Sequence, residues 1–168
     1  MTVRLASEDD WPAILEVHRQ AFGGDDVPRL ADELHTSTDL YVPELSFVAL
    51  AGDDVVGHAM STWSTVESSG ERVLQLSPVG VLPEHQRRGH GSELVRRSLD
   101  AVRARGEPLL LVEGNPDYYG RFGFVRADAL GLLPPPEALY DWAFQVAVLD
   151  DRAALPRGRV VYSAPFRR

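Results

Sequence analysis

The segment LQLSPVGVLPEHQRRGHG, residues 74–91, decides how this chain folds. Its first half is apolar and predicts a β-strand over 74–82. Pro83 then turns the chain toward the loop 86–91, which leads into a long amphipathic helix predicted over 91–105. The apolar residues of that helix share one face: Leu94, Val95, Leu99 and Val102. The segment therefore predicts strand, loop and helix in direct succession.

The loop between this strand and helix has the composition of an anion-binding site. A helix leaves its first backbone N–H groups without partners, and its dipole places partial positive charge there. Gly89 and Gly91 lack a Cβ, so a diphosphate can approach the backbone closely, and Arg87 and Arg88 add positive charge. The loop lacks the Gly-Lys-Ser/Thr ending of a triphosphate loop, and Leu94 replaces the third glycine of a dinucleotide fingerprint. A diphosphate is the expected ligand group.

Hydrophobic periodicity and turn residues predict the other elements. Ser7 is expected to cap a helix that Gly23-Gly24 ends. The segment 39–44 is expected to be a loop, and 131–143 a loop with a short helix. A second helix is predicted over 28–34. Further strands are predicted over 3–5, 45–51, 55–63, 109–112, 144–149 and 160–162.

The predicted order of elements indicates a mixed sheet. The strands 74–82 and 109–112 are joined through a helix, and such a crossover implies that they are parallel. The strands before them are joined by short turns and are expected to be antiparallel. Pro78 removes a ladder donor inside a predicted strand, so either a bulge or an opening of the sheet is expected there.

Two motifs at this separation resemble those of one large family. The spacing Gln-x-x-Gly-x-Gly at 86–91 resembles the acetyl-coenzyme A signature of the GNAT superfamily of N-acetyltransferases. Residues 109–124, LLLVEGNPDYYGRFGF, look like that family's next strand and its Tyr-x-x-x-Gly-Phe turn. The Tyr-Tyr-x-Arg-Phe-Gly-Phe motif and the ending VVYSAPF at 160–166 are similar to a bacterial branch of predicted N-acetyltransferases. The resemblance covers roughly residues 2–166.

The resemblance implies a fold and a cofactor. The fold is α/β, of the three-layer α+β type, with a mixed, mostly antiparallel central sheet of about seven strands, splayed between two central parallel strands and flanked by helices. Residues 1–168 would form one such domain, with acetyl-CoA as co-substrate and no metal. Asn115 either contacts the cofactor arm or forms the turn before Pro116. The residues implied in cofactor binding are Val79, Val81, Gln86, Arg87, Arg88, Gly89, His90, Gly91, Ser92, Asn115 and Tyr119.

The resemblance also implies two catalytic side chains. Tyr119 matches the position where family members use a tyrosine hydroxyl to protonate the coenzyme A thiolate, and a packed aromatic residue is the alternative. The acceptor amine must lose a proton, and Glu113 at the end of a buried strand is the first choice of base. Glu67, Glu71 and a water chain to bulk solvent remain as alternatives.

Composition excludes several classes of function. The net charge of −8 over 168 residues argues against nonspecific nucleic-acid binding. The absence of cysteine excludes disulfides, thiolate metal sites and cysteine nucleophiles, so direct transfer is favoured. The five histidines lack metal-ligand spacing. No apolar run approaches the ~20 residues of a membrane span, and no signal peptide begins the chain, so a cytoplasmic location is expected.

The sequence as a whole indicates an enzyme that transfers the acetyl group of acetyl-CoA directly to a primary amine. A small-molecule acceptor is favoured over a protein, and a small amine, an aminoglycoside-like molecule, an amino acid, an aminoacyl nucleotide and a protein amino terminus stay open. No nucleic-acid or membrane partner is expected, and a homodimer stays open. The alternative from another class is a non-catalytic acyl-CoA or coenzyme A sensor. A nucleotide-binding α/β protein is a weaker third interpretation.

Overall fold

The computed structural model describes residues 1–167 and contains two compact units. Unit 1 consists of Met1–Thr62 and Leu76–Ala101, and unit 2 consists of Trp63–Gln75 and the chain from Val102 onward. The third and fourth strands run through both units. Among the described residues, no helix is both long and apolar enough to cross a membrane.

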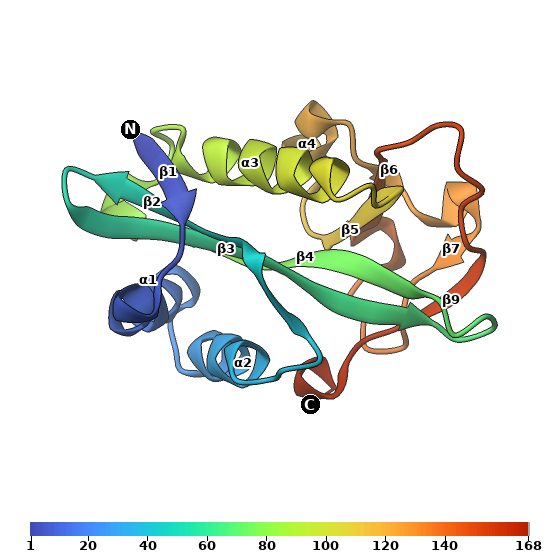
Figure 1. The fold of residues 1–168 in the computed structure, drawn as a ribbon, viewed down its shortest axis with the longest axis horizontal. Coiled ribbons are helices and arrows are strands. Elements are labelled where there is room, and N and C mark those ends of the chain that lie inside the picture. Colours follow the sequence, from blue (N-terminus) through green and yellow to red (C-terminus); the bar gives the residue numbers. More distant parts are fainter. Residues whose placement is uncertain (168) are drawn as a thin grey trace. The chain divides into compact units, whose positions relative to one another are not determined.

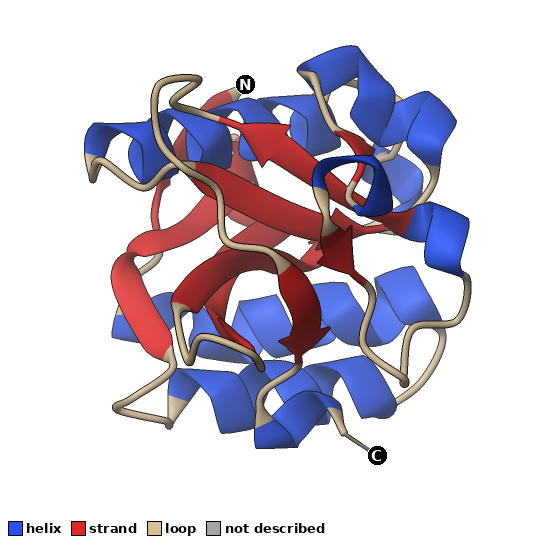
Figure 2. Cartoon of the chain, turned by 90° about the vertical axis from the view of Figure 1, so that its right-hand side faces the viewer, coloured by secondary structure: helices blue, strands red, loops and turns tan. Residues whose placement is uncertain are grey.

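A mixed sheet forms the centre of the fold, with helices on its faces (Figure 2). In the described part of the chain it has nine strands, in the order β1-β2-β3-β4-β5-β8-β6, while β9 pairs with β3 and β7. The β4–β5 and β7–β9 pairs are parallel, and the pairs β1–β2, β2–β3, β3–β9, β5–β8 and β6–β8 are antiparallel. The strands are β1 Thr2–Leu5, β2 Tyr41–Ala51, β3 Asp54–Val66, β4 Arg72–Val81, β5 Leu109–Glu113, β6 Val125–Arg126, β7 Leu132–Leu133, β8 Phe144–Val148 and β9 Gly158–Val161. The mixed, mostly antiparallel sheet is confirmed, and β6 and β7 are too short for a periodic pattern to predict.

Unit 1 contains two α-helices and most of a third, and they cover opposite faces of its strands. They are α1 Trp11–Phe22, α2 Asp26–His35 and α3 His90–Ala104, as predicted to within a few residues. Figure 1 shows α1 and α2 on one side of β2 and β3 and α3 on the other. The side-chain contacts agree, because a Cβ on Gly57 would meet Leu94 of α3, whereas His58 bonds to His18 of α1.

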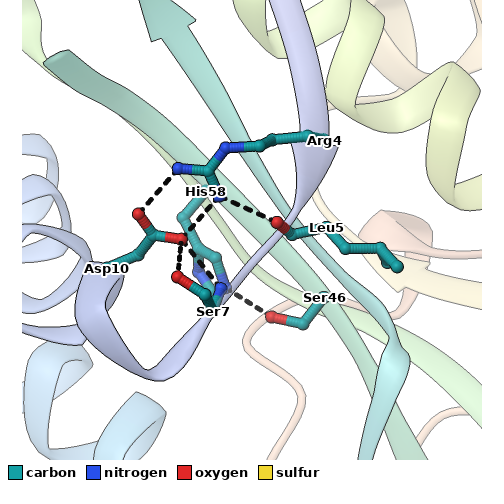
Figure 3. A network of polar contacts seen from close by, with 6 residues as sticks. All are labelled: Arg4, Leu5, Ser7, Asp10, Ser46 and His58. Atoms are coloured by element: carbon teal, nitrogen blue, oxygen red, sulfur yellow. Dashed lines mark hydrogen bonds and ion pairs between the residues drawn. The ribbon is translucent and has the colours of Figure 1, made fainter. Parts of the chain in front are cut away.

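A charged network fixes the start of α1 to β1 (Figure 3). The Asp10 carboxylate accepts hydrogen bonds from the Arg4 guanidinium at 2.7 and 2.9 Å, and from the amide and hydroxyl of Ser7 at 2.8 and 2.9 Å. The Arg4 bond is the main cause of the lowered pKa of Asp10. The sequence predicted Ser7 as the cap of this helix, but Ser7 caps the short 3-10 turn Glu8–Asp10 that leads into α1, in a capping box with Asp10.

The expected loop at 39–44 is wrong, because β2 begins at Tyr41. Tyr41 pairs with Thr62, and the register then shifts before Ser46 pairs with Met60. The shift forms a bulge in which Pro43 is exposed and needs no ladder partner. Pro43 followed by Glu44 is typical of a turn, which explains the wrong prediction. In the structure, the bulge accommodates Pro43 and the strand continues.

The two parallel strands pair over a very short distance. Gln75 of β4 pairs with Leu111 of β5, and this is the whole of their ladder in the described chain. Pro78 follows three residues later, after a cis Ser77–Pro78 peptide bond. The parallel pairing and the opening after it agree with the splayed sheet predicted from the sequence.

The strands of unit 2 enclose an apolar core. Phe144 and Val146 of β8 pack with Leu109 and Leu111 of β5, and Tyr162 completes this cluster. The segment expected to be a loop with a short helix, 131–143, contains β7 and a single helical turn at Asp141–Ala143. The short helix α4, Pro116–Tyr119, follows β5.

Candidate cofactor loop and catalytic cluster

The loop 82–89 lies in unit 1 between β4 and the first turn of α3. A helical turn at Pro83–His85 follows the strand, and α3 begins at His90. The Gln86 side chain donates a hydrogen bond to the Val81 carbonyl at 3.0 Å, which ties the loop back to the strand end. Gly89 has a φ of 93°, which favours glycine, and Arg87 adopts a φ of 57°, which few non-glycine residues do. Gly91, in contrast, has no positive φ.

This loop presents an exposed, positively charged surface at the helix N-terminus. Gln86, Arg87, Arg88 and Gly89 are exposed, and Gly91 and Ser92 are partly exposed. His90 is buried, its Nδ1 has no partner among the described residues, and burial lowers its pKa, so the imidazole is neutral at pH 7. Free N–H groups of α3, the two arginines and the close approach allowed at Gly89 suit a diphosphate group. Val79 is partly exposed and Val81 is buried in the strand that leads here.

Tyr119 lies in unit 2, where its ring packs on Gly114. A Cβ on Gly114 would collide with Cε2 of Tyr119, so the ring of Tyr119 rests on this glycine. The same ring packs edge-on against Tyr118 and Phe124, at centroid distances of 5.0 and 5.6 Å. Burial raises the pKa of the Tyr119 phenol, which keeps it protonated over the whole physiological range. The structure therefore places Tyr119 against Gly114, the residue that follows Glu113 in the chain.

Asn115 caps the helix that carries Tyr119. Its side-chain oxygen accepts a hydrogen bond from the Asp117 amide at 2.9 Å, and Pro116 follows as the first helical residue. The turn-forming role proposed for Asn115 is therefore present. Because Asn115 is exposed, its amide nitrogen remains available to a ligand.

The Glu113 carboxylate is held from two sides. Tyr162 donates its hydroxyl proton to Oε2 at 2.7 Å, and the Leu139 amide donates to Oε1 at 2.9 Å. Two further side chains extend this hydrogen-bonded network from Tyr162. Gln75 hydrogen-bonds to the Tyr162 phenol, and Ser64 donates a hydrogen bond to the Gln75 side chain at 2.9 Å. We call Ser64, Gln75, Tyr162 and Glu113 the tyrosine chain.

The tyrosine chain was missed in the sequence, although one signal for it was present. Gln75 is a polar residue between two leucines of an apolar strand, and it is only 2 % exposed. A buried amide needs partners, so its position predicts a polar contact inside the fold. The identity of that partner, 87 positions further on, cannot be deduced from the strand itself.

A second polar chain lies in unit 1 and contains two of the five histidines. Ser46 hydrogen-bonds to His58 Nε2 at 3.0 Å, and His58 Nδ1 to His18 Nε2 at 2.8 Å. We call these three residues, each 0 % exposed, the histidine chain. Burial lowers the pKa of His18 to about 4 and that of His58 as well, so both rings are neutral at pH 7.

Two other carboxylates were candidate bases, and both lie in one turn. Glu67 and Glu71 are exposed in the turn between β3 and β4. No group of three or more histidine, aspartate or glutamate side chains in residues 1–167 is arranged to hold a metal ion.

Comparison with known proteins identifies the family of the chain. The family model described as an acetyltransferase (GNAT) domain matches residues 2–127. YjhQ of Escherichia coli, an uncharacterized N-acetyltransferase, is 31% identical over 73% of this chain and 68% of its own length. Two Streptomyces relatives, each 33% identical, are longer, and the chain spans about a third of their length.

Solved structures extend the likeness over the full chain. YhbS of Escherichia coli, in complex with CoA, has a TM-score of 0.88 and 26% identity, covering 99% of this chain and 92% of that one. A GNAT family acetyltransferase from Brucella melitensis, in complex with acetyl-CoA, has a TM-score of 0.80 and 26% identity, covering 98% and 97%. Both share the mixed sheet with flanking helices described above.

Proposed function

This chain belongs to the GNAT family of acetyltransferases, and on that premise we propose that it transfers the acetyl group of acetyl-CoA to a primary amine. The proposal assigns residues 1–168 to one catalytic domain of the bacterial branch with the Tyr-Tyr-x-Arg-Phe-Gly-Phe motif. It includes a cytoplasmic location, no metal, and a small-molecule acceptor in preference to a protein.

The observation that carries the proposal is the loop before α3. Its exposed arginines and the free N–H groups of a fifteen-residue helix form a site suited to a diphosphate. Proteins that resemble this chain over almost all of its length were crystallised with CoA and with acetyl-CoA. The cofactor residues in the proposal are Val79, Val81, Gln86, Arg87, Arg88, Gly89, His90, Gly91, Ser92, Asn115 and Tyr119.

The chemistry proposed is a direct attack of the amine on the thioester. The amine nitrogen forms a bond to the acetyl carbon, the C–S bond breaks, and coenzyme A leaves as a thiolate. Glu113 takes the proton that the amine loses, and the protonated hydroxyl of Tyr119 supplies a proton to the sulfur as negative charge develops there. The proton lost by the amine goes to Glu113, and the proton gained by the sulfur comes from Tyr119.

Thermal unfolding with acetyl-CoA, free coenzyme A and NAD tests the cofactor. A ligand that binds only the folded state at one hundred times its Kd adds about 2.7 kcal/mol of stability, so both coenzyme A species should raise Tm and NAD should not. The double variant Arg87→Ala/Arg88→Ala should lose most of this rise, while Arg105→Ala, an exposed arginine just after α3, should keep it. A rise with NAD alone would favour a nucleotide-binding protein.

Thiol release from acetyl-CoA in the presence of primary amines tests the reaction. We expect release with wild type and a loss of it in Tyr119→Phe, with the Tm rise by acetyl-CoA retained. The alternative function is a coenzyme A sensor without turnover. It would show the Tm rise and no thiol release with any amine.

A further inference from the structure

The ending VVYSAPF has no part in the function proposed so far, although its tyrosine contacts a proposed catalytic residue. Tyr162 is 4 % exposed and stands directly after β9, among the apolar side chains of the unit 2 core. Its hydroxyl oxygen is 2.7 Å from Oε2 of Glu113, which lies 49 positions away in the sequence. Burial, and then the Glu113 carboxylate, raise the pKa of this phenol, so it stays a proton donor.

All the hydrogen bonds of the tyrosine chain run in one direction. Ser64 donates to the oxygen of the Gln75 amide, which leaves the amide nitrogen to donate to the Tyr162 oxygen. Tyr162 in turn donates to Glu113. Donors aligned in this way polarise one another, and their effect is to stabilise negative charge at the end of the chain. That end is the carboxylate of Glu113.

The Glu113 carboxylate keeps room for a ligand. Two carboxylate oxygens offer about four acceptor positions, and Tyr162 and the Leu139 amide use one on each oxygen. Glu113 is only partly buried, in contrast to the residues behind it. A partly exposed carboxylate that is held in position from two sides is suited to bind an ammonium group, because charge-assisted hydrogen bonds are the strong ones.

The segment that Glu113 holds adds features that favour a cation. Tyr140 and Trp142 are stacked at a centroid distance of 5.1 Å and are 57 and 48 % exposed, and aromatic rings at a surface attract organic cations. The Gly114 amide bonds to the Ala143 carbonyl at 3.0 Å, so both ends of this segment are fixed to residues 113–114. Tyr119 rests on the same Gly114.

We propose that Glu113 binds the acceptor amine in its protonated form, and that Tyr162 is the positioning residue that holds Glu113 for this purpose. This inference rests on the proposed acetyl transfer and adds the class of acceptor, an alkylammonium ion. The bound ammonium group gives its proton to Glu113 as the free amine attacks the thioester. Tyr162 touches neither substrate nor cofactor and acts through Glu113.

Kinetics with two matched amines test the inference. Benzylamine is protonated at pH 7 and aniline is neutral, although both carry a phenyl ring. At saturating acetyl-CoA, Tyr162→Phe should raise the KM for benzylamine about tenfold, since it removes a hydrogen bond to a charged group. The kcat and the KM for aniline should change much less. Tyr41→Phe removes a partly buried phenol hydroxyl in unit 1 and should leave both constants unchanged.

A double-mutant cycle separates positioning from general destabilisation. Glu113→Gln should raise the KM for benzylamine more than Tyr162→Phe does, and the double variant should match Glu113→Gln alone. If the two effects multiply, or if Tyr162→Phe behaves like wild type, the inference is overturned. The Tm of each variant and its rise with acetyl-CoA show that the protein is folded and binds the cofactor.

The Leu139 amide gives a readout that needs no turnover. In ¹⁵N-leucine-labelled protein, its resonance should move in Glu113→Gln and move part of the same way in Tyr162→Phe, because the carboxylate that it contacts has shifted. Benzylammonium chloride should move the same resonance in wild type and leave it unmoved in Glu113→Gln. An unmoved resonance in wild type would overturn the ammonium site, whereas failure of acetyl-CoA to raise Tm would instead remove the proposed acetyl transfer.

Discussion

The histidine chain of unit 1 and the tyrosine chain of unit 2 are both made of hydrogen-bonded polar side chains, but their terminal groups differ in exposure. Each links residues far apart in the sequence through hydrogen bonds of 2.7–3.0 Å between buried side chains. The histidine chain ends at His18 Nδ1, which is buried beside the backbone of Gly80 and has no partner among the described residues. The tyrosine chain ends at a partly exposed carboxylate.

This difference separates a polar chain that serves the fold from one that, in our proposal, holds Glu113 for a ligand. The neutral rings of His18 and His58 hydrogen-bond to each other inside the protein, where charge would be costly. The donors of the tyrosine chain instead stabilise one charge at a position that solvent reaches. We therefore expect changes in the histidine chain to alter the free energy of unfolding, and changes near Glu113 to alter chemistry first.

The largest expected effect is that of His58→Ala. The change opens a cavity and leaves Ser46 and His18 without their partner, so the free energy of unfolding should fall by roughly 4 kcal/mol. Urea unfolding measures the difference, with His85→Ala in the partly exposed loop as the control. A loss below about 1 kcal/mol would mean that the histidine chain contributes little to the fold.

Acidification should weaken the same chain. The pKa of His18 is about 4 in the folded protein and about 6.5 when unfolded, so between these values the unfolded state binds more protons and stability rises with pH. The stability is complete above pH 6.5 and is lost as pH falls toward 4. From pH 7 to pH 5 His18 should account for about 2 kcal/mol of lost unfolding free energy. Urea unfolding at both pH values should show a smaller loss in His18→Gln, and an equal loss would contradict the assignment.

Gly80→Ala tests how tightly the end of the histidine chain is packed. The new Cβ would stand 2.8 Å from His18 Nδ1, and relieving that contact should lower the free energy of unfolding by roughly 1.5 kcal/mol. Gly24→Ala is the matched control, since nothing lies within 4 Å of its Cβ position. Equal urea midpoints for the two variants would show that His18 can move away freely.

Ser64→Ala should have the smallest effect, at the far end of the tyrosine chain. It leaves the buried Gln75 oxygen without its donor and should lower the free energy of unfolding by about 1 kcal/mol. Ser61→Ala, in the same strand, removes a buried hydroxyl that has no partner among the described residues and should be neutral or stabilising. Thermal unfolding compares the pair, and the reverse order would contradict the hydrogen bond to Gln75.

Sequence patterns predicted most helices and strands, because the formation of these elements depends on residues that are near one another in the chain. The apolar face of α3, the glycine that ends α1 and the loop between β4 and α3 all follow from periodicity and local turn chemistry. The prediction failed at Tyr41–Glu44, where pairing with β3 outweighed a local preference for a turn. The two-residue strands β6 and β7 exist only through their partners.

The sequence by itself predicted a loop suited to a diphosphate, because its glycines, its arginines and the start of the helix lie within a few positions of one another. The resemblance of its motifs to one family implied Tyr119 and Glu113. Only the tertiary structure decided what those residues touch. The partnership of Glu113 with Tyr162, and that of His18 with His58, join positions 49 and 40 apart. Such contacts depend on the register of strands that are distant in the chain, and a one-residue shift would turn each side chain to the opposite face of the sheet.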